Sequence, residues 1–278
     1  MAGSRCVLNS PCSDENIMHY YVFKDVRLPP FCRGKMEEIS NFHVREDDVW
    51  VVSYPRSGLW LEDLIYLIMH YAEVGTGELS PDSVENGVQF LEYPHPGLES
   101  INNLPSPRII KTHLPFCMLP KAVREAHCKV IYMCRNPKDV MCSFYDFHRM
   151  VKIVNYKCTL SQFFYRFFNH KLGYGSYFDH VLDWWNHKEE ENLCIVKYED
   201  MKKNFAAFIR NLGKFLEREL TVEDVTNLEN YWISQTQYNK KEDRVGQWKS
   251  YFTVLMDEKF DEFLPEKLKR STLQFDYQ

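Results

Sequence analysis

The stretch that decides the fold reads Val49-Trp50-Val51-Val52-Ser53-Tyr54-Pro55-Arg56-Ser57-Gly58-Leu59-Trp60. Its first half is β-branched, aromatic and apolar on both faces, a pattern typical of a buried parallel strand. Pro55 to Gly58 breaks that strand. Apolar residues then recur at helical spacing, at Leu61, Leu64, Ile65, Ile68, Met69 and Ala72. The sequence therefore predicts a strand, a tight loop and a helix.

Further elements of both kinds follow along the chain. Apolar, strand-like runs lie at Arg108–Thr112, Lys129–Cys134 and Leu193–Tyr198, and helical segments lie around Leu160–Phe168 and Tyr177–Trp185. Strands that alternate with helices predict an α/β fold. We expect a central, mainly parallel sheet with helices covering both of its faces.

The first forty or so residues carry neither pattern, and Pro29-Pro30 favours extended backbone there. We expect residues 1–25 to be an irregular N-terminal segment and residues 26–278 to form a single domain. A chain of this length can bury a sizeable core.

Composition disfavours several classes of protein. The formal net charge of −5 argues against nucleic acid binding, so any anion must be held by a local site. The nine cysteines include no C-x-x-C pair, which disfavours a disulfide scaffold or a zinc site and favours a reducing compartment. Met1–Ser13 lacks signal-peptide character, and there is no run of about 18 apolar residues that could span a membrane. We expect a cytoplasmic protein that binds neither a membrane nor a metal.

Ligands of parallel α/β sheets bind at the carboxyl ends of the strands. The loop that follows the first predicted strand combines Arg56, the hydroxyl of Ser57, Gly58 and a helix N-terminus, and together these favour a phosphate group. It lacks the Gly-Lys pair of the nucleoside triphosphate signature. Taken alone, an ordinary strand-to-helix turn is the more common interpretation.

His113 follows the predicted strand at 108–112 and lies beside Lys111. A histidine in this place is a candidate general base, and the lysine can stabilise an anionic transition state. The chain contains ten histidines, so a structural role is the alternative.

A second cationic loop follows the predicted strand at 129–134. Asn136-Pro137 favours a turn and then a helix, which would bring Arg135, Lys138 and Ser143 close enough to hold another phosphate. A solvated helix start with a charged face is the alternative.

These loops resemble the motif set of the cytosolic sulfotransferases. The resemblance runs from about Val26 to the C-terminus in the family's order and spacing, and residues 26–41 and 244–249 are most similar to the brain sulfotransferase-like, or 4A, subgroup. The matching motifs are Ser53–Gly58, Lys111–Pro115, Arg135–Asp139 with Ser143, Lys197–Met201 and Arg244–Lys249.

The resemblance implies transfer of a sulfuryl group from 3′-phosphoadenosine 5′-phosphosulfate (PAPS) to a small phenol, amine or alcohol. His113 would take the acceptor proton, while Lys111 and Arg56 would neutralise developing charge. The donor would be held by Arg56, Ser57 and Gly58 at its 5′-phosphosulfate, by Arg135 and Ser143 at its 3′-phosphate, and by Tyr198, Trp60 and Lys241 elsewhere. No metal is implied.

The chain departs from the family pattern in the donor site. Arg56 replaces the usual lysine, the loop lacks the usual threonine after Gly58, and Lys241-Glu242-Asp243 falls where the family has Arg-Lys-Gly. These departures motivate the alternative function of a weakly active or inactive sulfotransferase-like protein that binds nucleotides or protein partners. A nucleotide kinase is a third, weaker alternative.

Three further expectations rest on the resemblance. The run from Lys249 to Glu258 resembles the family's dimerisation motif and predicts a homodimer, although by itself it reads as a short strand or turn. Trp232 is a stand-in for the adenine-stacking aromatic. The acceptor-pocket candidates, each of which is also plausible as plain core, are Phe90, Tyr93, Phe116, Phe147 and His148.

Overall fold

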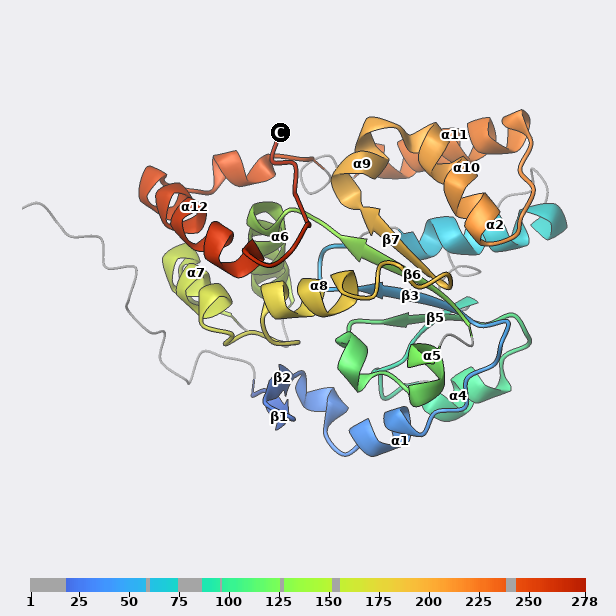
Figure 1. The fold of residues 1–278 in the computed structure, drawn as a ribbon, viewed down its shortest axis with the longest axis horizontal. Helices are drawn as coiled ribbons and strands as arrows, with labels where there is room; N and C mark the ends of the chain where they lie inside the picture. Colours follow the sequence, from blue (N-terminus) through green and yellow to red (C-terminus); the bar gives the residue numbers. More distant parts are fainter. Residues whose placement is uncertain are drawn as a thin grey trace, which may run out of the picture.

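The computed structural model describes residues 19–58, 61–74, 87–95, 97–125, 128–151, 156–238 and 244–278. At its centre lies a five-stranded sheet with the order β4-β5-β3-β6-β7, and every neighbouring pair in it is parallel (Figure 1). The strands are β3 (Val49–Ser53), β4 (Val88–Phe90), β5 (Ile109–Thr112), β6 (Lys129–Cys134) and β7 (Leu193–Lys197). The predicted α/β fold with a parallel sheet is confirmed.

Helices cover both faces of this sheet. Their bounds are α1 (Met36–Ser40), α2 (Leu61–Val74), α4 (Leu98–Asn103), α5 (Lys121–Arg124), α6 (Pro137–Met150), α7 (Leu160–Phe168), α8 (Tyr177–Trp185), α9 (Tyr198–Lys203), α10 (Phe205–Phe215), α11 (Val222–Tyr238) and α12 (Val254–Leu268). In Figure 1, α2, α10 and α11 lie on one side of the strands, and α1, α4 and α5 lie on the other.

Strand β3 lies between two apolar cores, and all five of its residues are buried. Val49 and Val51 face a core built with α2, α10 and α11. Trp50 and Val52 face the other core, which is built with α6, α7 and α8. The continuous apolar run in the sequence thus reflects burial on both faces.

The expectation of irregular backbone near the N-terminus is wrong from Tyr21 onward. Strands β1 (Tyr21–Phe23) and β2 (Val26–Leu28) form an antiparallel hairpin, and α1 follows. The two residues between the strands, Lys24 and Asp25, both have positive φ. This geometry matches the favoured two-residue hairpin turn, which usually carries glycine or asparagine. Asp25 is a common turn residue but Lys24 is not, so the sequence signal of this turn is weak.

Other boundaries also differ from expectation. Tyr54 and Tyr198 lie just beyond β3 and β7, and the short strand β4 was not predicted. The run from Lys249 to Glu258 is no strand: it contains the end of a 3₁₀ helix and, after the cap at Thr253, the first residues of α12. The hydroxyl of Thr253 accepts a hydrogen bond from the Met256 N–H, which favours a helix start there.

Six cysteines of the described part are free thiols, whereas Cys158 takes part in a disulfide bond. Within the described ranges, no helix is both long enough and apolar enough to cross a membrane.

Candidate active site

The parallel register brings four loops to one edge of the sheet. Val52 pairs with Thr112, Ser53 with Met133, and Cys134 with Lys197, so β3, β5, β6 and β7 end side by side. After β3 the chain forms β4 and β5 on one side of β3 and then crosses to β6 and β7 on the other side. In parallel α/β sheets, ligands bind where the strand order reverses in this way. The loops predicted to carry the chemistry are therefore adjacent.

In the loop after β3, Arg56 has a φ of +71°, and its side chain contacts α6. Arg56 Nε donates to Ser143 Oγ at 3.0 Å, and the guanidinium lies 5.5 Å from the centre of the Phe147 ring. The structure thus joins two residues that are far apart in the sequence and were both predicted to hold the donor.

Ser57 and Gly58 complete this loop. The Ser57 side chain is fully buried, and its hydroxyl has no hydrogen-bond partner in the described part of the chain. A Cβ atom at Gly58 would lie 2.8 Å from Ser53 Oγ, so the loop packs too closely on β3 for any larger residue. A buried hydroxyl without a protein partner fits a site for a polar ligand.

Arg135 is fully buried at the end of β6, and its guanidinium lies 4.4 Å from the centre of the Tyr198 ring. Its Nη2 donates to the Arg244 carbonyl at 3.1 Å. Asp139, 3.9 Å away, also accepts hydrogen bonds from the backbone N–H groups of Gly246 and Trp248. The segment after 244 is thereby fastened beside Arg135.

Lys138 was predicted to lie close to Arg135 and Ser143, but its side chain is directed elsewhere. Its ammonium reaches α12 instead, where it pairs with Asp257 at 2.5 Å and with Asp261 at 2.6 Å. It also lies 4.4 Å from the centre of the Trp248 ring. The prediction is wrong because Lys138 lies on the side of α6 that faces the C-terminal helix.

His113 is held at three points. Its backbone N–H donates to Glu92 Oε1 at 2.8 Å, its carbonyl accepts from His180 Nε2 at 3.0 Å, and its ring Nδ1 lies 2.7 Å from the Ser53 carbonyl. A carbonyl oxygen can only accept, so Nδ1 carries the proton and Nε2 presents a lone pair. Nε2 has no hydrogen-bond partner among the described residues.

The His113 imidazole is neutral near pH 7. Burial, assisted by the positive charge of Lys111, lowers its pKa to about 3. Phe90 and Tyr174 enclose the ring, with centroids 5.1 Å and 5.4 Å away, yet the residue retains partial exposure. A neutral, fixed and accessible imidazole can act as a general base.

Lys111 is paired with a carboxylate rather than extended alone. It forms an ion pair with Glu62 of α2, and both side chains are partly exposed. Burial lowers the pKa of Lys111, but the Glu62 and Asp63 carboxylates outweigh burial and raise the pKa overall. Lys111 therefore keeps its charge and shares it with α2.

Residues 46–272 match the family model described as a sulfotransferase domain. The chain belongs to the sulfotransferase family. It is 42% identical over 266 residues to sulfotransferase 4A1 of Homo sapiens, and the alignment covers 93% of each chain. It is also 34% identical over 264 residues to the amine sulfotransferase of Oryctolagus cuniculus, which covers 86% of this chain and 87% of the relative. The predicted family and the resemblance to the 4A subgroup are confirmed.

A solved structure supports the same assignment. The mouse sulfotransferase SULT7A1 complexed with PAP has a TM-score of 0.76 to this chain at 27% identity, and the match covers 91% of this chain and 96% of that chain. The described fold is thus a sulfotransferase fold.

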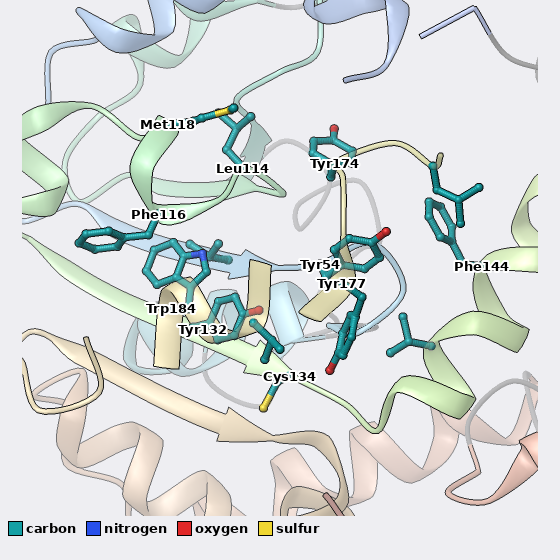
Figure 2. Packing of buried hydrophobic residues seen from close by; sticks show 14 of the residues in the cluster. Tyr54, Leu114, Phe116, Met118, Tyr132, Cys134, Phe144, Tyr174, Tyr177 and Trp184 are labelled. Atoms are coloured by element: carbon teal, nitrogen blue, oxygen red, sulfur yellow. The ribbon is translucent and has the colours of Figure 1, made fainter. Parts of the chain in front are cut away.

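The residues predicted to line an acceptor pocket divide into two groups. Phe90 and Tyr93 contact each other beside His113, and Phe147 lies under Arg56. Phe116 instead packs on Trp184 (Figure 2) and on His187. His148 is buried, and its Nδ1 donates to the Phe144 carbonyl. Phe116 and His148 therefore have core positions.

Three predicted donor contacts have different outcomes. Trp60 and Lys241 lie outside the described residues, as do Leu59 and Glu242-Asp243. Trp232 lies on α11, 8% exposed, with its ring 4.9 Å from that of Phe205 and 5.2 Å from the Lys202 ammonium. It is part of the core beneath α9 and α10.

Sequence reasoning missed the polar residues that hold the site in place. Glu62, Glu92 and His180 contact Lys111 or His113, but they lie 49, 21 and 67 residues away from them. Glu92 offered one usable signal, because it is a charged residue that follows Phe90-Leu91 at the end of β4. The other two offered none.

Glu92 predicts a pH dependence of stability. Burial raises its pKa to about 7 from an ordinary value of 4.5, even though the His113 N–H bond opposes the rise. The folded state then binds the proton more tightly than the unfolded state, so stability falls as pH rises from about 4.5 to about 7. The shift corresponds to at most about 3 kcal/mol.

Glu92→Gln keeps an oxygen for the His113 N–H and removes the titration. We expect its free energy of unfolding to fall less than that of the wild type between pH 5 and pH 8, as measured by urea denaturation. Glu99→Gln, an exposed exchange on α4, is the control and keeps the wild-type slope. Identical slopes for Glu92→Gln and the wild type would contradict the prediction.

Proposed function

We propose that this chain moves a sulfuryl group from PAPS to a hydroxyl or amine of a small acceptor, with His113 as the general base. The observation that carries the proposal is the state of His113. Its Nδ1 is engaged by the Ser53 carbonyl, its Nε2 is unprotonated, and it lies at the sheet edge where the cationic loops meet. The imidazole therefore presents an unprotonated nitrogen to an acceptor.

The donor nucleotide fits the cationic side of this edge. Arg56, Ser57 and Gly58 would hold the 5′-phosphosulfate, and the buried Ser57 hydroxyl is available to donate to it. Arg135 and Ser143 would hold the 3′-phosphate, and Tyr198 would contact the adenine end. Support comes from the mouse relative that was solved with PAP. Roles for Trp60 and Lys241 remain predictions from the family pattern.

The proposed reaction breaks the bond between sulfur and the bridging phosphate oxygen of PAPS and forms a bond between sulfur and the acceptor oxygen or nitrogen. The acceptor proton passes to His113 Nε2, and the nucleotide leaves as 3′-phosphoadenosine 5′-phosphate (PAP). Lys111 and Arg56 would stabilise the charge that develops on the leaving oxygen. The residues position the reactants and balance charge, as in phosphoryl transfer.

A second candidate is a weakly active or inactive member of the family that binds nucleotides or protein partners. One contact favours it: Glu62 pairs with Lys111, the cation assigned to the leaving group. A paired lysine has less charge to offer the transition state. The enzyme requires both the nucleotide site and the action of His113, whereas the second candidate does not require His113 to act.

The test of nucleotide binding is thermal unfolding of the purified protein over a titration with PAP. A ligand at a hundred times its Kd stabilises the folded state by about 2.7 kcal/mol, so the unfolding temperature should rise with the PAP concentration. 5′-AMP, which lacks the 3′-phosphate, is the matched control and should give a smaller rise. No rise at millimolar PAP would contradict the proposal.

We also propose a cytoplasmic homodimer formed through the run from Lys249 to Glu258. Val254 is 77% exposed at the start of α12, and Leu255 beside it is 38% exposed. Burying these side chains in a second copy would remove apolar surface from water. Val254→Glu should convert a dimer into a monomer in light scattering coupled to gel filtration. A wild-type protein that is monomeric at high concentration would contradict this.

A further inference from the structure

His180 lies in the middle of α8 and is only 2% exposed. Its ring is enclosed by aromatic residues, with Tyr54 at 5.5 Å and Tyr132 at 5.7 Å between ring centroids. Figure 2 shows the aromatic group to which these residues belong, with Tyr132 beside Trp184 and Tyr54 beside Tyr177. Burying a polar ring in such a group is costly unless both of its nitrogens have partners.

Both nitrogens of His180 do have partners. Nε2 lies 3.0 Å from the backbone carbonyl of His113, and Nδ1 lies 3.0 Å from the hydroxyl of Tyr132. The carbonyl can only accept, so Nε2 carries the proton and Nδ1 accepts from the Tyr132 hydroxyl. These two bonds define a single neutral tautomer. In agreement, burial lowers the pKa of His180 to about 4.

The bond from His180 completes the support of His113. Glu92 holds the backbone N–H of His113, the Ser53 carbonyl holds its ring, and His180 holds its carbonyl from α8. We propose that His180, itself oriented by Tyr132, is a positioning residue that keeps His113 Nε2 directed at the acceptor. This inference rests on the proposed function of His113 as the general base.

Trp184 is the natural comparison, since it lies one turn further along α8. It too stacks on Tyr132, with centroids 5.0 Å apart, and it is fully buried. Its indole N–H has no hydrogen-bond partner among the described residues. Trp184 shows that this part of the core accepts a ring that has no hydrogen-bond partner in the described part of the chain. If residue 180 also served only to fill space, an apolar ring would be sufficient there. The polar ring of His180 instead links Tyr132 to His113.

The experiment compares three variants in single-turnover transfer from PAPS. His180→Leu should lower the rate by about a hundredfold, because small displacements of a reacting group have effects of that size. The Kd for PAP should stay at the wild-type value, since His180 contacts none of the donor residues. His180→Gln can still donate to the His113 carbonyl and should recover most of the rate. Trp184→Phe, the control for core disturbance, should keep the wild-type rate.

A double variant separates positioning from misfolding. His180→Leu leaves the Tyr132 hydroxyl buried without its partner, so we combine it with Tyr132→Phe, which removes both polar groups. The double variant should bind PAP and unfold cooperatively, yet remain as slow as His180→Leu. Equal rates for His180→Leu and the wild type would overturn the inference, as would equal losses in His180→Leu and His180→Gln.

The ¹⁵N spectrum of the His113 imidazole gives a readout that does not depend on activity. The wild type should show the Nδ1-protonated tautomer alone, and His180→Leu should show exchange between tautomers. An unchanged His113 spectrum in His180→Leu would overturn the inference. A wild type that transfers no sulfuryl group would instead contradict the proposed function, and the spectrum would still test the positioning of His113.

Discussion

A His113→Ala variant is expected to lose sulfuryl transfer by about 10²–10⁴-fold in kcat, the usual contribution of a general base. The imidazole is removed, but the backbone N–H and carbonyl that contact Glu92 and His180 remain. The nucleotide site on the other loops should therefore be intact. Single-turnover transfer from labelled PAPS gives the rate, and a PAP titration gives the Kd.

The pattern of the two measurements distinguishes a base from a binding residue. We expect the rate to fall while the Kd for PAP stays within the error of the wild-type value. His43→Ala, at an exposed histidine before β3, is the control and should have no effect. Undiminished transfer by His113→Ala would refute the assignment of the base.

The largest expected effect on stability is at Asp48. Its carboxylate forms two hydrogen bonds with the Arg108 guanidinium, from Nε at 2.7 Å and from Nη2 at 2.5 Å, and both side chains are completely buried. Asp48→Ala would leave a buried positive charge without a counter-ion. Breaking such a pair costs about 3–5 kcal/mol, which chemical denaturation would measure as a lower free energy of unfolding.

Two variants make this measurement specific. Asp47→Ala removes the neighbouring, exposed carboxylate, whose hydrogen bond comes from Ser106, and should change stability by less than about 0.5 kcal/mol. Replacing Asp48 by Leu together with Arg108 by Met removes both charges and should recover much of the loss. If Asp48→Ala is no more harmful than Asp47→Ala, the buried pair does not stabilise the fold.

The same pair separates stability from function. Asp48 directly precedes β3 and Arg108 directly precedes β5, so the pair lies at the amino ends of the strands. The candidate site lies at the carboxyl ends. Asp48→Ala should therefore lower the unfolding temperature while the folded fraction keeps the wild-type Kd for PAP.

Elements with a strong local pattern were predictable from the sequence. Strand β6 and helices α7 and α8 have the predicted bounds. Their apolar residues recur with the period of a strand or a helix within a short stretch of sequence, so no contact with a distant segment is needed to predict them. His113 and Arg135 were placed correctly at strand ends, since parallel strands bring their carboxyl ends together. The hairpin at Tyr21 to Leu28 was missed because its turn uses Lys24 and Asp25, both at positive φ, without the glycine or asparagine that usually marks such a turn.

Contacts between distant segments were not predictable. Lys138 looked like a phosphate ligand because it follows Arg135 closely, but its partners Asp257 and Asp261 lie 119 and 123 residues further on. The pairing of Lys111 with Glu62 depends in the same way on how α2 packs against β5. Residue type and spacing show which groups are present, and packing decides which charges meet.

The most direct test of the central claim is transfer of a labelled sulfuryl group from PAPS to a panel of phenols, amines and sterols by the purified protein. We expect a labelled product with at least one acceptor, and we expect its loss in His113→Ala. PAP binding without any labelled product would favour the nucleotide-binding alternative. If the protein transfers no sulfuryl group to any acceptor and is not stabilised by PAP, the proposed function is wrong.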